Sequence, residues 1–146
     1  MIVETDFETI RYIWKDYLWP TRTSAIEQHS AMLLNGTLDI KNFDNKATFL
    51  LYHDNGSIAG CNSGHLCSDN SYRSRGLYVF PEYRKQGIGK KLLEQTINIG
   101  KKENASMVWS YPRYESWNTY LSAGFSLCSE WAASETGINA YCILKF

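Results

Sequence analysis

One stretch of the sequence, Leu77 to Leu93, restricts the fold more than any other. Its pattern predicts a strand, a polar turn, and a helix whose first turn contains Gly87 and Gly89. At a helix N-terminus the first N–H groups lack partners within the helix, and the helix dipole adds positive partial charge. Glycine lets a bulky phosphate touch that backbone, since it has no Cβ atom. Because Arg84, Lys85, Lys90 and Lys91 add positive charge, the stretch predicts a site for a phosphate-bearing ligand.

Two familiar glycine-rich loops do not fit this stretch. A Walker loop requires G-x-x-x-x-G-K-(S/T), but Arg84 stands at the first glycine and Lys91 at the Ser or Thr that binds magnesium. A dinucleotide-binding loop requires G-x-G-x-x-G directly after a strand, and here Leu92 stands at the third glycine. A nucleotide-phosphate binder of either fold is therefore disfavoured.

The stretch resembles the acyl-CoA signature of the GNAT superfamily of N-acetyltransferases, (Q/R)-x-x-G-x-(G/A), at Arg84, Gly87 and Gly89. A second signature of that family, Y-x-x-x-G-F, is matched by Tyr120, Gly124 and Phe125. The alternative is an ordinary helix entry whose glycines serve only the turn, and the second signature disfavours it. The resemblance implies one domain over residues 1–146 with an α/β (α+β) acyl-CoA N-acyltransferase fold. That fold has a mixed central sheet of about six to seven strands flanked by about four helices.

Apolar spacing and turn residues predict the individual elements. Capping boxes at Thr5-x-x-Glu8 and Ser24-x-x-Glu27 predict two helices, the first ending at Trp19-Pro20 and the second at Asn35-Gly36. Asn55-Gly56 predicts a tight hairpin between strands 48–53 and 58–66. The other expected elements are a weak strand 2–4, a loop 37–46, a strand 73–80 antiparallel to 58–66, a helix 88–100, a strand 105–111 parallel to 73–80, a helix 115–122, and a closing antiparallel pair 125–131 and 139–146.

Composition limits the partners. The 146 residues include 15 basic and 15 acidic side chains, so the formal net charge of zero gives no global field to attract nucleic acid or an anionic membrane. No basic, apolar leader begins the chain and no stretch approaches a membrane span, so we expect a cytoplasmic protein. The partners we expect are a small-molecule or peptide amine and, in a homodimer, a second copy of the chain.

The cysteines do not indicate a disulfide framework or a metal site. None of the four forms a C-x-x-C pair, and we expect all of them to be reduced and buried. Cys61, His65 and Cys67 share one strand face, but at ~3.3 Å per residue the first two lie ~13 Å apart, too far for one zinc ion. We therefore expect no metal.

The resemblance implies an acetyl-CoA site. Tyr120 would protonate the departing thiolate, and a bulge in the strand Leu77–Val79 would free backbone groups for the pantetheine arm and the thioester oxygen. Arg113 and Ser116 stand where many relatives have Asn and Ala, and the Arg113 guanidinium offers donors in place of the Asn contact. The residues expected at the cofactor are Leu77, Tyr78, Val79, Arg84, Lys85, Gln86, Gly87, Ile88, Gly89, Lys90, Arg113, Ser116 and Tyr120.

The acceptor side is less determined. Where some relatives carry a Glu base, this chain has Arg73, which leaves His65 or a water chain as base. Strand alternation places Arg73, Arg75, Leu77 and Val79 on one face. The two arginines then either reach solvent beside carboxylates such as Asp69 or Glu82, or enter an acceptor cleft and favour an amine with a carboxylate or phosphate. The residues expected around the acceptor are Trp19, Arg73, Arg75, Trp109 and Tyr111.

The function that these patterns predict is transfer of an acetyl group from acetyl-CoA to a primary amine by direct attack. The alternative is a catalytically idle acyl-CoA binding or sensor module of the same fold. Tyr120 favours the enzyme, whereas Arg73 and Arg113 favour the idle module.

Overall fold

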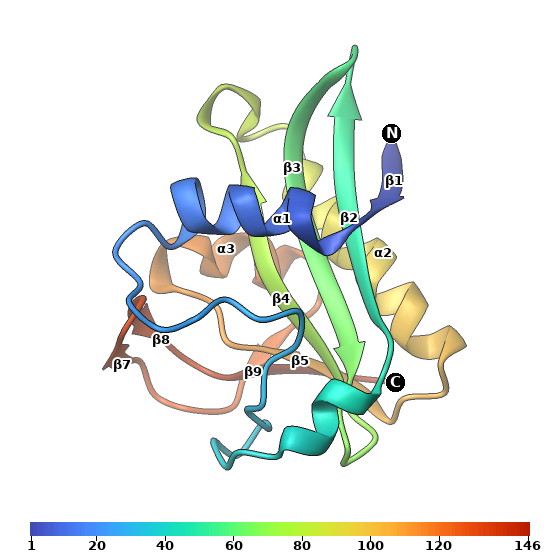
Figure 1. Cartoon of the computed structure of the whole chain (residues 1–146), viewed down its shortest axis with the longest axis vertical. Helices are drawn as coiled ribbons and strands as arrows, with labels where there is room; N and C mark the ends of the chain where they lie inside the picture. The colour runs from blue at the N-terminus through green and yellow to red at the C-terminus, as the bar shows by residue number, and fades with distance from the viewer.

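A mixed sheet of seven strands, in the order β1-β2-β3-β4-β5-β9-β6, runs through the molecule in the computed structural model, which describes all residues 1–146 (Figure 1). Only β4 and β5 pair in parallel. The strands are β1 (Ile2–Thr5), β2 (Ala47–Asp54), β3 (Ser57–Leu66), β4 (Tyr72–Val79), β5 (Met107–Ser110), β6 (Ser126–Leu127) and β9 (Cys142–Lys145). A separate hairpin consists of β7 (Ala132–Ser134) and β8 (Gly137–Asn139).

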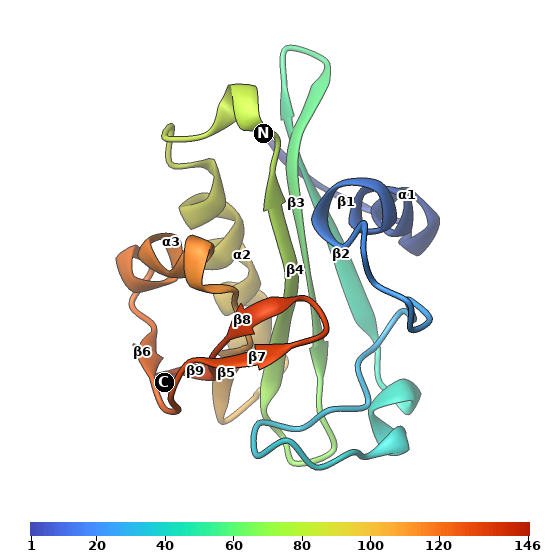
Figure 2. The same ribbon diagram turned by 90° about the vertical axis from the view of Figure 1, so that its left-hand side faces the viewer.

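Three α-helices accompany the sheet, one fewer than expected. They are α1 (Phe7–Ile13), which continues into a π-helical turn over Trp14–Leu18, α2 (Ile88–Lys102) and α3 (Trp117–Ser122). Short 3-10 helices cover Ile40–Asp44, Pro81–Tyr83 and Tyr114–Ser116. Figure 2 shows α1 on one face of the sheet and α2 with α3 on the other. None of the helices has the length and apolar character needed to cross a bilayer.

Each face of the sheet carries its own core. On the α1 face the buried side chains include Ile10, Trp14, Phe49 and Tyr78. On the α2 face one cluster gathers around Leu93 and Val108, and another around Ile88 and Leu92. Trp14 is completely buried and its indole Nε1 donates to the Gly76 carbonyl at 2.8 Å, so α1 is fixed directly onto β4.

The predicted strand, turn and helix are confirmed. Asn55 and Gly56 both have positive φ, at 50° and 83°, as a tight hairpin between β2 and β3 requires. Strand β4 leads through the glycine turn into α2, and β5 returns parallel to β4. The closing pair is confirmed only in part, because β6 pairs with β9 while residues 132–139 form the separate hairpin.

Two expectations about the N-terminal third are wrong. The first helix is capped by Asp6, whose carboxylate accepts from the Thr9 N–H at 2.9 Å, because Thr5 belongs to β1. No helix forms over 24–34, and these residues run as a loop across the α1 side of the sheet. The Ser24 hydroxyl and N–H donate to Glu135, far along the chain, instead of capping a helix. A tertiary contact thus replaces the local one.

The cysteines are all free thiols. Cys61, Cys67 and Cys142 are buried, whereas Cys128 is exposed, so the expectation of burial is wrong for Cys128. Burial raises the pKa of the Cys61 thiol to about 12, which keeps it protonated. The structure contains no group of three His, Cys, Asp or Glu side chains suited to a metal ion.

Candidate active site

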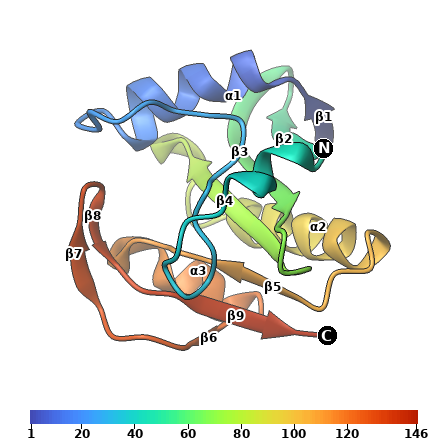
Figure 3. The same ribbon diagram turned by 60° about the horizontal axis from the view of Figure 1, so that its bottom comes forward.

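A bulge in β4 creates the site. Gly76 has a φ of +80°, and the register between β3 and β4 shifts between Cys61 and Ser63, which places an extra residue in β4. Beside it, β4 pairs with β5 only at Tyr72 and Arg73. Figure 3 shows the two strands separating beyond that point. The predicted bulge and splay are therefore confirmed.

Two cavities open where the strands separate. The first, here called the arginine cavity, has a volume of about 550 Å³ and contains Arg22, Arg73, Arg75 and Arg113 in its lining. The second, the loop cavity, has a volume of about 500 Å³ and lies against the glycine turn and α3. Leu77, Arg113 and Ser116 line both cavities. A ligand with two ends can therefore pass from one cavity to the other beside Leu77.

The loop cavity presents unpaired backbone donors. No N–H group from Lys85 to Lys90 donates a hydrogen bond to another protein group, and the first helical bond of α2 runs from Lys91 N–H to the Gly87 carbonyl. Lys85 and Gly87 both have positive φ, at 63° and 78°. Such a turn at the start of a helix makes a concave surface of N–H groups that suits phosphate oxygens.

Most of the residues predicted for the cofactor lie in this cavity. The Arg84 Nε donates to the Val79 carbonyl at 2.8 Å and so holds the turn against the end of β4. The predicted residues that line the loop cavity are Leu77, Tyr78, Val79, Arg84, Lys85, Gly87, Ile88, Gly89, Lys90, Arg113 and Ser116. Gln86 is not part of the lining, and Tyr120 lines the arginine cavity instead. Sequence reasoning missed Tyr83, Glu115, Asn118, Thr119 and Ser122, which also line the loop cavity.

Tyr120 lies at the inner wall of the arginine cavity. Its side chain is 3% exposed, and its ring meets the ring of Phe125 edge to face at 5.5 Å. Burial raises the pKa of the Tyr120 phenol above its ordinary value, and a hydrogen bond with Ser110 offsets part of that rise. The hydroxyl therefore stays protonated at neutral pH and is able to donate a proton.

Of the residues predicted for the acceptor, Trp19, Arg73, Arg75 and Tyr111 line the arginine cavity. Trp109 does not line it. Its indole is completely buried, donates to the Ser71 hydroxyl at 3.0 Å and lies under the Arg73 guanidinium, 4.5 Å from the ring centroid. Trp109 thus contacts Arg73 through a cation–π interaction and does not face the cavity itself.

The predicted strand parity is wrong beyond Arg75, because the extra residue at the bulge reverses the alternation. Arg75 stacks against Trp14 and Trp19 on the α1 face. Leu77 and Val79 pack on the opposite face, against the cluster of α2. The arginines also do not reach solvent, since Arg73 is 7% and Arg75 4% exposed.

His65 is not placed to act as a base. It is buried at 1% exposure and lines neither cavity. Its Nε2 accepts from the Ser30 N–H at 3.2 Å. Burial, followed by the charge of Arg73, lowers the pKa of His65 to about 3, so the ring is neutral and serves the packing of the loop.

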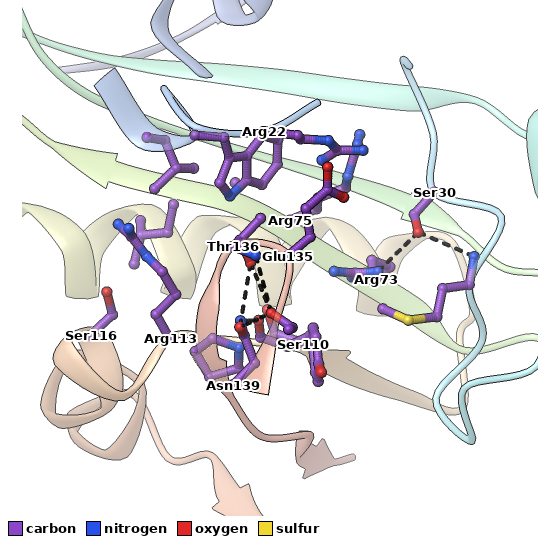
Figure 4. Close-up of a pocket in the computed structure, with 18 of the residues that line it drawn as sticks. Arg22, Ser30, Arg73, Arg75, Ser110, Arg113, Ser116, Glu135, Thr136 and Asn139 are labelled. Atoms are coloured by element: carbon purple, nitrogen blue, oxygen red, sulfur yellow. Dashed lines mark hydrogen bonds between the residues drawn. The ribbon is translucent and has the colours of Figure 1, made fainter. Parts of the chain in front are cut away.

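Sequence reasoning missed the half of the arginine cavity that comes from the 24–38 loop and the β7–β8 hairpin. Figure 4 shows Glu135, Thr136 and Asn139 of the hairpin among the residues around the cavity, with Glu135 in the same part of the view as Arg22 and Arg75. The Asn139 amide donates to the Tyr111 carbonyl at 2.9 Å and so anchors the hairpin. The Glu135 carboxylate accepts hydrogen bonds from Thr23 and Ser24. No local pattern marks these residues, because their partners lie far away in the sequence.

Comparison with known proteins places this arrangement in a family. The model of the "Acetyltransferase (GNAT) family" matches residues 8–125, whereas no curated protein sequence matches the chain. An acetyltransferase of the GNAT family from Staphylococcus aureus Mu50 has a similar structure, with 17% identity, 99% of this chain and 98% of that chain covered, and a TM-score of 0.66.

Two further solved structures share the fold. For the ribosomal-protein-S18-alanine N-acetyltransferase of Escherichia coli the identity is 16%, the coverage 99% of this chain and 92% of that chain, and the TM-score 0.62. For a Bacillus subtilis acetyltransferase in complex with CoA the identity is 14%, the coverage 68% of this chain and 77% of that chain, and the TM-score 0.59. Because the family model covers most of the chain, this protein belongs to the GNAT family of acetyltransferases.

Proposed function

We propose that this acetyltransferase transfers the acetyl group of acetyl-CoA to a primary amine of a small molecule or peptide, by direct attack of the amine on the thioester. The observation that carries the proposal is the meeting of the two cavities at Leu77, where β4 has left β5. With the thioester of acetyl-CoA placed there, the CoA part would lie in the loop cavity and an acceptor would approach from the arginine cavity. The CoA bound to the Bacillus subtilis relative supports the choice of cofactor.

The loop cavity has the chemistry that CoA needs. The free N–H groups of Gln86–Lys90 suit the pyrophosphate, and Arg84, Lys85 and Lys90 add positive charge beside them. The edge of β4 beyond Arg73 is no longer paired with β5, so its backbone groups are available to the amides of the pantetheine arm. A backbone N–H at this edge is also suited to hold the thioester oxygen as negative charge develops.

Tyr120 completes the transfer. The nitrogen of the neutral amine forms a bond to the carbonyl carbon, the carbon–sulfur bond of the tetrahedral intermediate breaks, and the thiolate takes the proton of the Tyr120 hydroxyl. The nitrogen loses a proton to water as the amide forms, and water returns a proton to the Tyr120 phenolate. The amine must first lose its own proton. The only acidic side chain that lines the arginine cavity, Glu135, is engaged by hydrogen bonds, so water receives that proton. The neighbouring guanidiniums favour this loss, because positive charge disfavours an ammonium ion.

A second candidate is an idle acyl-CoA binding or sensor module. The observation in its favour is that the arginine cavity offers no histidine and no carboxylate other than the hydrogen-bonded Glu135, while Arg73 stands where some relatives have a Glu base. The two candidates differ in turnover and share cofactor binding.

Thiol release from acetyl-CoA, measured with a panel of amino acids, peptides, aminoglycosides and polyamines, separates the candidates. We expect turnover with at least one class of amine, and binding of acetyl-CoA without any turnover would favour the idle module. Gly87→Val fills the space of the loop cavity where no atom lies within 4 Å of a new Cβ. It should weaken acetyl-CoA binding in calorimetry at least about tenfold, through loss of contacts to the phosphate.

The matched control is Gly56→Val. Gly56 has nearly the same φ, +83° against +78°, and equally open surroundings, but it lies in the β2–β3 hairpin outside both cavities. Both variants carry the same backbone strain, so only a specific loss in Gly87→Val supports the cofactor assignment. Equal affinity of the two variants for acetyl-CoA would refute it.

A further inference from the structure

The arginine cavity contains two buried guanidiniums whose charge is not paired. The Arg73 Nη1 donates to the Ser30 hydroxyl at 3.1 Å, and the Arg75 Nη1 donates to the Glu27 carbonyl at 2.8 Å. These acceptors are neutral. The Arg73 Nε is buried without any hydrogen-bond partner. A guanidinium has five N–H donors, and burying its charge is costly unless an anion compensates it.

Aromatic rings hold both guanidiniums by their faces. Arg73 lies 4.5 Å from the centroid of Trp109, and Arg75 lies 4.8 Å from Trp14 and 5.4 Å from Trp19. Stacking of this kind stabilises the cation but leaves the N–H groups in the plane of the guanidinium unused. Those in-plane groups are the ones that bind a carboxylate or phosphate with two parallel hydrogen bonds.

The rest of the cavity does not supply the missing anion. Arg22 and Arg113 add two more positive charges to the lining, and Glu135 is its only acidic residue. The N–H and hydroxyl groups of Thr23 and Ser24 all donate to the Glu135 carboxylate. The Glu135 carboxylate keeps its charge, but these four bonds hold it against the loop, and it makes no hydrogen bond to Arg73 or Arg75.

We infer that the acceptor is an amine that brings its own anionic group, a carboxylate or a phosphate, which binds between Arg73 and Arg75 while the amine points toward Leu77 and Tyr120. This inference rests on the proposed function, because it names the acceptor class of that site. Both arginines lie on β4 before the bulge, and Leu77 lies after it, so one small molecule reaches the guanidiniums and the thioester together. A polyamine meets four arginines in this cavity, and the only carboxylate of the cavity, that of Glu135, already accepts four hydrogen bonds, so a polyamine is disfavoured.

A matched pair of acceptors tests the inference without any mutation. An amino carboxylate and its carboxamide offer the same amine, but only the first has the anion. Loss of one partner of a buried, hydrogen-bonded charge pair costs about 2 kcal/mol or more, so we expect kcat/KM to favour the carboxylate by about 30-fold or more. An aminoalkyl phosphate of similar length shows which anion is preferred. Equal kcat/KM for carboxylate and carboxamide, or a preference for spermidine, would overturn the inference.

Variants assign the preference to the two arginines. Arg73→Gln and Arg75→Gln should reduce the ratio of carboxylate to carboxamide turnover toward one and change carboxamide turnover much less. A purely structural role would lower both rates together. Arg73→Lys keeps the charge but not the two parallel donors, and should give an intermediate ratio even if the Gln variants fold poorly. Arg11→Gln, on the exposed side of α1, is the control and should leave the ratio unchanged.

Binding distinguishes failure of this inference from failure of the proposed transfer reaction. The Trp rings beside the guanidiniums report on the site, so a carboxylate that lacks the amine should change tryptophan fluorescence in the presence of CoA, and less so in Arg73→Gln. If no amine is acetylated but this response persists, the transfer reaction is refuted and the anion site stands. If amines are acetylated without a response or a carboxylate preference, the anion site is refuted and the transfer reaction stands.

Discussion

Tyr120 and Tyr72 show how the setting of one residue decides its chemistry. Both are buried phenols, at 3% and 0% exposure, and burial raises the pKa of each. Tyr72 lines neither cavity, whereas Tyr120 lines the arginine cavity, where we propose that the reaction takes place. A phenol held protonated in this way keeps its proton available for a group that leaves beside it.

We therefore predict that Tyr120→Phe lowers kcat by about 10²–10⁴, the usual range for loss of a general acid. The ring still packs against Phe125, so the affinity for acetyl-CoA should change little. Steady-state kinetics and calorimetry measure the two effects separately. Tyr72→Phe is the matched control and should keep kcat. If Tyr120→Phe turns over normally, the thiolate takes its proton from water and Tyr120 is a packing residue.

The pH profile carries a prediction at the same scale. Because the pKa of Tyr120 is raised, its ionisation should not reduce kcat between pH 7 and the ordinary phenol pKa of about 10. The rate should instead rise through this range as more of the amine loses its proton, since no unengaged base lines the cavity. A decline of kcat between pH 7 and 9 that disappears in Tyr120→Phe would contradict this.

At the scale of elements, the bulge of β4 is the feature on which both cavities depend. Gly76 adopts a left-handed φ of +80°, and a Cβ placed on it would lie 2.2 Å from the indole of Trp14. This position requires a left-handed backbone and leaves no room for a Cβ atom beside Trp14, and only glycine satisfies both requirements. The bulge directs Arg75 to the α1 face and Leu77 to the α2 face.

Gly76→Ala should destabilise the protein by about 2–5 kcal/mol, from left-handed strain together with overlap in a packed core. Gly56→Ala has a similar φ of +83° and no atom within 4 Å of its Cβ, so it should lose only the strain, about 1–2 kcal/mol. Urea unfolding of both variants measures the difference. Equal stabilities would show that Trp14 moves aside at no cost.

Elements with local signals were predictable from the sequence. Asn55-Gly56 marks its hairpin because both residues accept positive φ, and Gly87 marks the turn before α2 for the same reason. The bulge was expected only from the family resemblance, since an extra residue in one strand leaves the apolar alternation intact on both sides. The parity of Leu77 and Val79 relative to Arg73 was therefore predicted wrongly, although each residue was assigned correctly to the strand.

At the scale of the whole molecule, the residues of the loop cavity were largely predictable from the sequence, whereas those of the arginine cavity were predictable only in part. The loop cavity is built mainly from one continuous stretch, residues 77–90, and from α3. The arginine cavity joins the 18–38 segment, β4 and the β7–β8 hairpin. The Ser24-x-x-Glu27 pattern suggested a helix, but Ser24 bonds to Glu135 and the Glu27 carbonyl to Arg75. Such contacts between distant residues leave no periodic signal in the sequence.

Glu135 links two walls of the arginine cavity that lie far apart in the sequence, and it gives the last prediction. Hydrogen bonds from Ser24 and Thr23 lower the pKa of Glu135 from 4.5 to about 2. The pKa of this carboxyl group is lowered while it accepts hydrogen bonds from the loop. Its ionised form therefore stabilises the contact between hairpin and loop above the ordinary pKa, and that stabilisation is lost as the pH falls toward 2. The amides of Thr23 and Ser24 should therefore be protected from hydrogen exchange at pH 6 and lose protection below pH 4.

Glu135→Ala should remove this protection at every pH, because it deletes the acceptor of both amides. Glu130→Ala, an exposed acidic residue in the segment that leads to β7, is the control and should leave the protection factors of Thr23 and Ser24 unchanged. Hydrogen exchange measured by NMR at pH 3 and pH 6 distinguishes the variants. If Thr23 and Ser24 exchange equally fast in the wild type and in Glu135→Ala, the Glu135 carboxylate does not hold the loop against the hairpin.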